Sequence, residues 1–350
     1  MKLSVFSSLD DSPSIERYAR ELAANFPAGV EVNRVWFPKS RGWKGRVFDK
    51  HLKYLRVAKQ QQGDFNLIVS EGYAFLLLAL EGRRTAVVCH DLHPLIYRGP
   101  TPRGFWKARY KFNLRRLRAA RFVIAVSEHT RKDLLKYCPF LAPEKVFAVH
   151  NGLDASWRVL EDPGRAAGFR RRHGLEGKCF ALHVGNDNWY KNFGGLLRAL
   201  AALPDRELLL VKVGEIGAEH RRLIASLGLE SRVRHVPHAS SEELLDFYNA
   251  AEMLVFPSWH EGFGWPPLEA MACGCPVIAS PRASLPEVCG EACLYVQPDD
   301  PAAIAAAMQK LLREPALRAD LARKGSAQAR RFSWKQTAAR MVELFQHSSG

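Results

Sequence analysis

Short apolar runs of β-type composition alternate along the chain with longer polar or amphipathic segments, as repeated strand–helix–strand units require. The first runs occupy residues 2–8, 30–37, 65–70, 85–91 and 122–127, and a further run, FAVH, ends at residue 150. After a polar, basic stretch the alternation restarts, with runs at residues 179–186, 207–214, 232–238, 253–258, 276–280 and 292–297. The pattern predicts an α/β protein with two successive doubly wound, Rossmann-like domains.

The length of the chain agrees with two domains, because 350 residues exceed the usual size of a single domain. The polar stretch at residues 155–175 is predicted to be a linker that contains a helix. We therefore place an N-terminal domain at residues 1–160 and a C-terminal domain at residues 161–331. The final segment, RFSWKQTAARMVELFQ, is predicted to be one more amphipathic helix with no strand after it.

Several features indicate a reduced, cytoplasmic protein. The longest apolar run, YAFLLLAL at residues 73–80, ends at Glu81 and is predicted to be a buried helix, because a membrane span needs about 18 apolar residues. The N-terminal residues predict a strand and lack the pattern of a signal peptide. The seven cysteines form no CxxC pair. Cys273 and Cys275 are expected to be buried small residues.

Chemically versatile residues follow the predicted strands, which is where open parallel sheets bind ligands. His90 and Asp91 follow one strand, residues 186–191 follow another, and the stretch HEGFGWPPLEA at residues 260–270 follows a third. In that last stretch two glutamates flank two glycines and two prolines. Because prolines are tolerated in the first turn of a helix, we expect a helix from about Pro266 to Gly274.

The two glutamates of this stretch, Glu261 and Glu269, can accept hydrogen bonds from hydroxyl groups, and the glycines between them can expose backbone amides to a phosphate. A nucleotide sugar offers both kinds of group. On these residues alone, a helix-capping glutamate beside a solvated loop glutamate explains the pattern equally well.

The net charge of +15 favours an anionic partner, such as nucleic acid, an acidic membrane or a phosphorylated substrate. Residues 98–121 contain nine arginines and lysines and no acid, and residues 41–59 contain seven against one aspartate. Because aromatic residues interleave with the cations, we expect the first stretch to dock on the anionic inner face of a bacterial membrane. A merely solvated face is the alternative. The expected membrane patch comprises Arg103, Trp106, Lys107, Arg109, Lys111, Arg115 and Arg116.

Six segments, in the right order, resemble the retaining glycosyltransferases of family 4, which have the GT-B fold. The stretch EGFGWPPLE resembles the E-x7-E motif of that family, and the match extends over nearly the whole chain. The last segment resembles the helix that crosses back onto the N-terminal domain, so residues 332–350 are expected to pack there. The other matching segments are VCHDLHPL, AVSEHTRKDL, HNGLD, HVGNDNWYKNFGGLLRAL and SSEELLDFYNAAEMLVFPSWHEGFG.

The resemblance implies roles for particular residues. Glu269 is similar to the glutamate that binds the ribose hydroxyls, and Glu261 to the glutamate that contacts the transferred sugar. Lys191 matches the base that neutralises the diphosphate, and His90 matches the histidine beside the donor sugar. Backbone amides are expected to come from Gly262, Phe263 and Gly264, whereas Asn186, Pro237 and His238 match further donor-binding positions, the last two beside the nucleobase.

The chain departs from the family pattern in three places. The loop after the first strand, SSLDDSPSIERY, has no glycine, so Ser12 or Ser14 is expected to supply a hydroxyl to the phosphate or acceptor. Asn186 stands where serine or arginine is common, and Tyr190 stands where the family has an arginine beside Lys191. That removes one positive charge from the diphosphate site. A segment PHA replaces a glycine before the nucleobase region.

The resemblance implies transfer of a hexose, with mannose favoured, from a GDP- or UDP-linked sugar to a glycan or lipid-linked acceptor in bacterial polysaccharide or glycolipid assembly. It implies a same-face transfer in which the leaving phosphate takes up the acceptor's proton. No metal or other cofactor is expected, and no nucleic-acid partner. Two alternatives stay open: a basic nucleic-acid-binding protein, and an epimerase or phosphorylase of GT-B shape.

Overall fold

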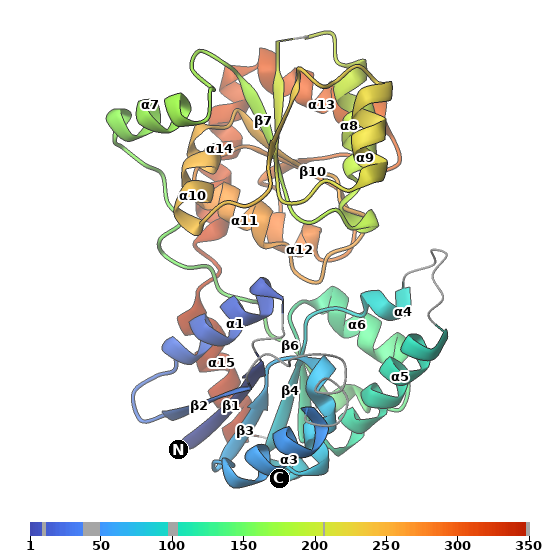
Figure 1. The fold of residues 1–350 in the computed structure, drawn as a ribbon. Coiled ribbons are helices and arrows are strands. Elements are labelled where there is room, and N and C mark those ends of the chain that lie inside the picture. Colours follow the sequence, from blue (N-terminus) through green and yellow to red (C-terminus); the bar gives the residue numbers. More distant parts are fainter. Residues whose placement is uncertain (9–11, 38–49, 97–103, 206, 348–350) are drawn as a thin grey trace. The chain divides into compact units, whose positions relative to one another are not determined.

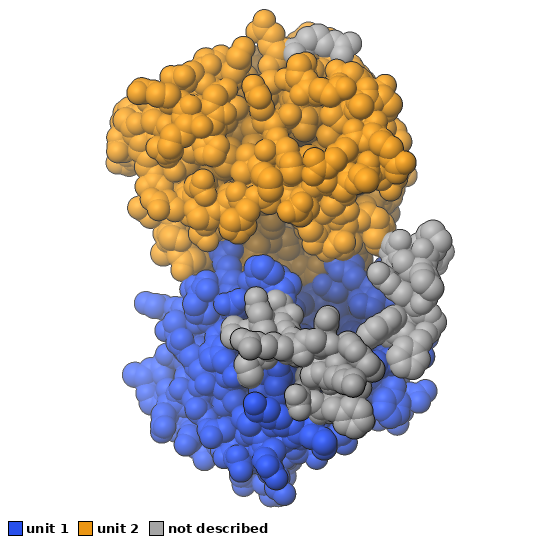
Figure 2. Space-filling model, viewed as in Figure 1, with its two compact units in different colours: residues 1–152, 332–350 blue, residues 153–331 orange. Residues whose placement is uncertain are grey.

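The computed structural model describes residues 1–8, 12–37, 50–96, 104–205 and 207–347 and divides the chain into two compact units (Figures 1 and 2). Unit 1 comprises residues 1–152 and 332–350, and unit 2 comprises residues 153–331. The sequence placed the boundary after residue 160, whereas the structure changes unit after Gly152. The whole of the expected linker, residues 155–175, belongs to unit 2, where it includes helix α7 (Pro163–Arg172).

The described part of unit 1 contains one six-stranded parallel sheet of order β2-β1-β3-β4-β5-β6. The order reverses direction between β1 and β3, and the carboxyl ends of strands beside such a switch point are where α/β sheets bind ligands. The strands are β1 (Lys2–Ser8), β2 (Glu31–Phe37), β3 (Phe65–Ile68), β4 (Thr85–Cys89), β5 (Phe122–Ala125) and β6 (Val146–Ala148). The α-helices are α1 (Pro13–Ala24), α3 (Lys50–Gln60), α4 (His93–Ile96), α5 (Gly104–Leu114), α6 (Glu128–Tyr137) and α15 (Trp334–His347). The 3₁₀ helices are η2 (Glu71–Leu78), η3 (Gly82–Arg84), η4 (Arg115–Ala119) and η5 (Pro143–Lys145).

The C-terminal helix α15 is part of the core of unit 1, although unit 2 separates it from the rest of this unit in the sequence. Its Phe345 is fully buried, with its ring centroid 4.9 Å from that of Phe65 and 5.1 Å from that of Phe122. Trp334 lies edge-on to Tyr18 of α1 at 5.4 Å. The chain therefore closes unit 1 only with its last helix.

The apolar run at residues 73–80 folds mainly as the 3₁₀ helix η2, with a kink at Tyr73. Its residues Tyr73 to Leu77 are buried against the sheet, as the sequence predicted, but Leu78 is 60% exposed. A segment that is apolar on every side can be buried on most of its surface, either as a 3₁₀ helix or as an α-helix. The hydrophobic periodicity of the sequence does not distinguish these two helix types.

The described part of unit 2 contains a second six-stranded parallel sheet, of order β12-β11-β10-β7-β8-β9. Its switch point lies between β7 and β10. The strands are β7 (Phe180–Val184), β8 (Leu209–Val213), β9 (Val233–Val236), β10 (Met253–Phe256), β11 (Val277–Ala279) and β12 (Cys293–Tyr295). The helices besides α7 are η6 (Trp189–Lys191), α8 (Phe193–Ala202), α9 (Ala218–Ser226), α10 (Ser241–Ala250), α11 (Trp265–Ala272), α12 (Leu285–Cys289), α13 (Pro301–Arg313) and α14 (Pro315–Ala329).

Helices cover both faces of the sheet of unit 2 (Figure 1). Helices α8, α9 and α13 share one hydrophobic core cluster, which includes Leu196, Ile224 and Met308. All seven cysteines of the chain are free, and Cys179 alone is exposed. Among the described residues, no helix is both long and apolar enough to cross a bilayer.

Candidate active site

The switch point of unit 2 brings together the two residues that the sequence singled out most strongly. Lys191 lies in the segment after β7, and Glu261 lies in the loop after β10. Because β7 and β10 are neighbours in the sheet, their carboxyl ends meet at one edge. Lys191 Nζ donates to both carboxylate oxygens of Glu261, at 2.9 and 3.1 Å.

The Lys191–Glu261 pair is buried: the two residues are only 8% and 7% exposed. The ammonium also lies over the ring of Phe256, 4.7 Å from the centroid, at the end of β10. Such a pair offers a cation and a carboxylate that are both desolvated and held in place, so each can bind a ligand group strongly once the pair rearranges.

Asn192 fixes the backbone directly after Lys191. It adopts a left-handed conformation with φ of 55°, which links η6 to α8. Its side-chain amide donates to the carbonyl oxygens of Pro257, at 3.1 Å, and Pro298, at 2.6 Å. These bonds join the lysine segment to the loop that carries Glu261.

The buried side chain of Ser284 bonds to the backbone between Glu261 and Glu269. Ser284 Oγ lies 2.9 Å from the carbonyl oxygen of Glu261 and 2.7 Å from that of Phe263. Gly264 precedes α11 with φ of 107°, a conformation that favours glycine. Phe263 itself is buried, and Gly262 lies between these anchored positions. The loop is therefore fixed in place at the N-terminus of α11, whose first turn contains two prolines.

Glu269 lies inside α11 and is 3% exposed. The hydroxyl of Tyr248, from α10, donates to Glu269 Oε2 at 2.9 Å. Burial, and then the neighbouring carboxylate, raise the pKa of Tyr248 well above its ordinary value, so this tyrosine is a permanent donor. Sequence reasoning missed Tyr248 and Ser284, because nothing in their local sequence links them to the glutamates.

Two further predicted donor-binding residues lie after β7 and after β9. Asn186 accepts the backbone N–H of Asn188 at 3.2 Å and shapes the turn after β7. His238 is exposed and, with Pro237, follows β9, the edge strand, with β8 between it and β7. The structure thus gathers the lysine and Glu261 closely and leaves His238 at the end of a more distant strand.

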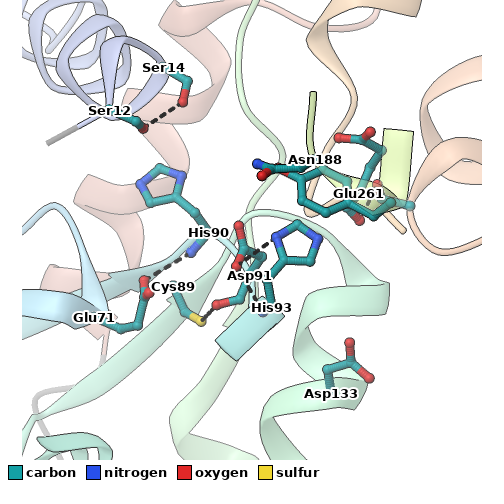
Figure 3. Close-up of polar contacts among 12 residues, drawn as sticks. Ser12, Ser14, Glu71, Cys89, His90, Asp91, His93, Asp133, Asn188 and Glu261 are labelled. Carbon is teal, nitrogen blue, oxygen red and sulfur yellow. Dashed lines mark hydrogen bonds and ion pairs between the residues drawn. The ribbon is translucent and has the colours of Figure 1, made fainter. Parts of the chain in front are cut away.

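In unit 1, His90 follows β4 and its neighbours are well defined (Figure 3). Its Nε2 lies 2.8 Å from the carbonyl oxygen of Val69, which can only accept, so Nε2 carries the hydrogen. Burial lowers the pKa of His90, which keeps the ring neutral at physiological pH. The ring of Tyr18 meets it edge-on at 4.8 Å. His90 is therefore a fixed, neutral side chain with its other nitrogen as an acceptor.

The backbone N–H of His90 donates to the carboxylate of Glu71 at 3.3 Å, and the hydroxyl of Tyr110 donates to the same carboxylate at 3.1 Å. Burial, followed by the charge of Asp91, raises the pKa of Glu71 to about 8. Asp91 in turn accepts the backbone N–H of His93 at 2.9 Å. Glu71 was not predicted from the sequence, although its place directly after the strand-like run at residues 65–70 was a usable signal.

The predicted loop hydroxyls lie at the start of α1. Ser12 Oγ and Ser14 Oγ are 2.9 Å apart and both residues are exposed (Figure 3). The side chain of Ser12 makes no capping bond to the helix, while its carbonyl oxygen accepts the first helical amides. Both hydroxyls are accessible to a ligand of unit 1.

Of the expected membrane patch, Arg103 and the side chain of Trp106 lie outside the described residues. Helix α5 turns Tyr110 and Leu114 inward, whereas Arg109, Lys111 and Phe112 are exposed. Phe112 is 60% exposed, and the guanidinium of Arg116 lies 5.1 Å from its ring centroid. A pocket of about 310 Å³ beside it is lined by Leu77, Leu78, Phe112, Arg115, Arg116, Arg118 and Ala119.

Two family models match the chain in succession. The model described as Glycosyltransferase Family 4 matches residues 2–157, and the model described as Glycosyl transferases group 1 matches residues 168–328. Together the two matches extend over most of the chain.

Similar proteins with known activities include several mannosyltransferases. The O-antigen chain mannosyltransferase B of Escherichia coli is 27% identical over 358 residues, which cover 97% of this chain and 88% of that protein. The serotype-specific mannosyltransferase WbdA of Escherichia coli is 30% identical over 276 residues, which cover 75% of this chain but only 33% of WbdA. The MMP alpha-(1->4)-mannosyltransferase of Mycolicibacterium hassiacum is 29% identical and covers 84% of this chain and 74% of that protein.

Solved structures share the fold over the whole chain. HepE from Anabaena, in complex with UDP and glucose, has a TM-score of 0.82 at 19% identity and covers 99% of both chains. WaaG, a glycosyltransferase involved in lipopolysaccharide biosynthesis, has a TM-score of 0.76 at 17% identity. The match covers 99% of this chain and 100% of the WaaG chain. The predicted GT-B architecture is thereby confirmed.

The predicted enzyme class is confirmed as well, because the family matches and the activities of the similar proteins agree on sugar transfer. They do not favour a nucleic-acid-binding protein. The chain is a glycosyltransferase and belongs to glycosyltransferase family 4.

Proposed function

We propose that this enzyme transfers a mannosyl residue, with retention of configuration, from a nucleoside-diphosphate mannose to a glycan or lipid-linked acceptor of bacterial surface-polysaccharide assembly. The observation that carries the proposal is the buried Lys191–Glu261 pair at the switch point of unit 2. The mannosyltransferase activities of the similar proteins support the choice of sugar, and the O-antigen activity of one of them supports the acceptor class.

In this proposal the donor lies over the loops of unit 2. Lys191 neutralises the diphosphate as its charge grows in the transition state, and Glu261 accepts hydrogen bonds from the sugar hydroxyls. Glu269 holds the ribose, with Tyr248 orienting its carboxylate through the bond at 2.9 Å. Asn186 and His238 are assigned to the donor through the family resemblance.

Binding of the donor must then separate the lysine from Glu261, because one ammonium cannot satisfy both the carboxylate and the diphosphate fully. The cation is already dehydrated, with only 8% of the residue exposed, so the ligand does not have to displace its water. The leaving phosphate takes up the proton of the acceptor hydroxyl on the same face. His90, which is neutral, can accept a hydrogen bond from a sugar hydroxyl through Nδ1.

The test is a panel of nucleotide sugars, including GDP- and UDP-linked mannose and glucose, with thermal stabilisation and calorimetry as readouts. A donor present at about 100 times its dissociation constant adds about 2.7 kcal/mol of stability. Transfer is followed as nucleoside diphosphate released only when acceptor is present, which separates a transferase from an epimerase. Retention of activity in a chelator tests the expected independence from metal. No binding of any nucleoside-diphosphate hexose would refute the proposal.

We further propose that the enzyme works on the cytoplasmic face of the cell membrane, bound through α5 and η4. Exposed cations, the exposed Phe112 and Leu78, and the apolar pocket between them suit an anionic bilayer surface, which attracts each nearby cation with about 1 kcal/mol. A lipid-linked acceptor would be presented at the same surface.

Co-sedimentation with vesicles tests membrane binding. We expect binding to vesicles that contain phosphatidylglycerol, little binding to neutral vesicles, and loss of binding at about 1 M salt, where screening acts within about 3 Å. Replacing Lys107, Arg109, Lys111, Arg115 and Arg116 by glutamine should abolish vesicle binding and leave nucleotide binding unchanged. The matched control replaces five exposed cations of unit 2, Arg171, Arg172, Lys178, Arg222 and Arg234. An equal loss of vesicle binding in both variants would show that only the net charge matters, and would contradict a membrane-binding surface on α5 and η4.

A further inference from the structure

Lys212 is a lysine on β8 of unit 2, the strand between β7 and the edge strand β9, and it has no exposed surface. It lies on β8 within the otherwise apolar run LLVKV, opposite His183 of β7 in the parallel register. A buried ammonium is strongly destabilising unless its hydrogens are bonded or its charge is used. The proposed donor site assigns no role to this residue, so its burial requires a reason.

The ammonium of Lys212 bonds to backbone oxygens at the carboxyl end of the sheet. It donates to the carbonyl oxygen of Gly185 and to that of Val213, the latter at 3.0 Å. It also faces the ring of Phe193, 5.5 Å from the centroid. Among the described residues, no carboxylate lies within ion-pair distance of it. The charge is thus solvated by dipoles but not neutralised.

Gly185 lies between two lysines. Its carbonyl accepts from Lys212, while a Cβ at this position would stand only 3.1 Å from Cε of Lys191. Gly214 makes the approach from β8 possible, because a Cβ there would collide with the carbonyl oxygen of Gly185 and stand 3.3 Å from Lys212 Nζ. Both glycines have positive φ, 145° and 102°. The absence of side chains at Gly185 and Gly214 therefore lets the ammonium of Lys212 approach the backbone segment that leads to Lys191.

We propose that Lys212 is a second cation of the donor-diphosphate site, acting from beneath Gly185, and that it supplies the positive charge which Tyr190 does not provide beside Lys191. This inference rests on the proposed function, since it takes the ligand of this loop to be a nucleoside diphosphate. Lys212 acts through the Gly185 segment and through its field, and does not touch the substrate. It is a positioning residue that also carries charge.

The titration of Lys212 gives the inference a measurable signature. Its pKa is lowered to about 8, chiefly by burial; Asp187 and Glu215 oppose this shift and Lys191 adds to it. Burial and the charge of Lys212 also lower the pKa of the neighbouring His183, which stays neutral. The remaining groups around the site are His220, paired with Asp187 at 2.7 Å, and His235, 3.0 Å from the carbonyl oxygen of Gly214.

A bound diphosphate stabilises the protonated form of Lys212. Between the pKa of the free protein and the higher pKa of the complex, binding must therefore take up a proton, and affinity must fall as the pH rises above about 8. The phosphate groups themselves titrate near about pH 6, so they do not contribute there.

The experiment is calorimetric titration of the full chain with UDP and with GDP, at about pH 7 and about pH 8.5, in two buffers that differ in ionisation enthalpy. We expect proton uptake by the wild type at the higher pH only. Lys212→Met should bind on the order of tenfold more weakly at pH 7 and should lose the uptake. The control Lys178→Met, an exposed lysine of the same unit, should do neither. Adding Tyr190→Arg to Lys212→Met should restore affinity but not the proton uptake.

The outcomes separate this inference from the proposed function. If the wild type binds neither UDP nor GDP, both the proposed function and the role of Lys212 are wrong. If it binds one of them and Lys212→Met keeps its affinity and its proton uptake, only the role of Lys212 falls. Should Lys212→Met fail to fold, the wild type alone decides, because binding without proton uptake at about pH 8.5 overturns the inference.

Discussion

At the scale of single residues, the buried Lys191–Glu261 pair of unit 2 makes the removal of either partner costly for stability. Removing one partner leaves the other as an uncompensated buried charge. We expect Lys191→Met to lower the free energy of unfolding by about 3–5 kcal/mol. The double variant Lys191→Met/Glu261→Leu should recover most of that loss while remaining inactive. Denaturant unfolding of the wild type, of the single variants Lys191→Met and Glu261→Leu, and of the double variant measures this, and strictly additive losses would contradict a direct interaction between the pair.

The carboxylate of Glu269 is expected to bind the ribose, so its loss should weaken nucleotide binding itself. A hydrogen bond to a charged group contributes about 1.5–3 kcal/mol, which predicts roughly 10- to 100-fold weaker binding of UDP or GDP by Glu269→Ala. Glu261→Ala should instead impair transfer. Titration with the 2′,3′-dideoxy nucleotides provides the control, because they lack both ribose hydroxyls and should bind equally to wild type and Glu269→Ala. An unchanged affinity of Glu269→Ala for the ribonucleotides would remove the ribose assignment.

Glu71 gives unit 1 a predicted pH dependence. Its folded-state pKa is raised to about 8 by burial and then by Asp91, so the folded chain keeps a proton that the unfolded chain releases above about pH 4.3. The contribution of this group is fully present at low pH and is lost as the pH rises to about 8. Glu71→Gln, which can retain the bonds to Tyr110 and to His90, should become the more stable protein as the pH rises through this window. Denaturation at about pH 5 and pH 8 should show a difference that grows by more than about 1 kcal/mol; a constant difference would contradict it.

The family motif marks Lys191, Glu261 and Glu269 as candidate donor-binding residues, but it does not show which residues hold them in place. That Lys191 and Glu261 touch depends on β7 and β10 being neighbours in the sheet, although 70 residues separate the two side chains in the sequence. Tyr248, Ser284 and Lys212 carry no local signal, except that Lys212 interrupts an apolar run. Hydrogen bonds between distant segments depend on strand order, which periodicity does not reveal.

At the scale of elements, the junction of η6 and α8 depends on one asparagine. Asn192 combines a left-handed backbone with two side-chain bonds to the loops after β10 and β12. Asn192→Ala loses those bonds and keeps the strained backbone, so unfolding free energy should fall by about 2–3 kcal/mol. Asn192→Gly relieves the strain but loses the same bonds, and should lose less. Thermal unfolding compares them, and equal stability of the two variants would show that the backbone conformation contributes nothing.

The strands themselves were predictable. Eleven of the twelve runs each contain one whole strand of the structure, and β6 starts one residue before the run FAVH. Strands of a parallel sheet that is covered on both faces tend to be near-continuous apolar segments. Helix type was less predictable: η2 is a 3₁₀ helix where the sequence indicated an ordinary buried helix. The expected helix at Pro266 forms as α11 from Trp265 to Ala272, since its proline pair fits the first turn. Element ends and helix type depend on packing, which the local pattern does not fix.

At the scale of the whole molecule, the chain builds unit 1, leaves it after Gly152, completes unit 2 and returns with Phe332. Gly152 marks the crossing, since a Cβ there would collide with the backbone of Trp334 at the start of α15. The two cores are made by different residues, α15 with the first sheet in one and α8 with α13 in the other. A cavity made in one core should therefore lower the stability of that unit and leave the stability of the other unit nearly unchanged.

A matched pair of cavity variants tests this independence. Phe345→Ala removes a fully buried ring from unit 1 and should destabilise it by about 3–5 kcal/mol, while Met308→Ala, fully buried in unit 2, should lower the stability of that unit by about 2–5 kcal/mol. Native-state hydrogen exchange resolves the two units separately. We expect Phe345→Ala to reduce protection in β1, β3 and β5 and to leave β7, β8 and β10 protected, and Met308→Ala to do the reverse. Loss of protection in all six strands by either variant would show one cooperative unit, in which the closing helix α15 stabilises both sheets together.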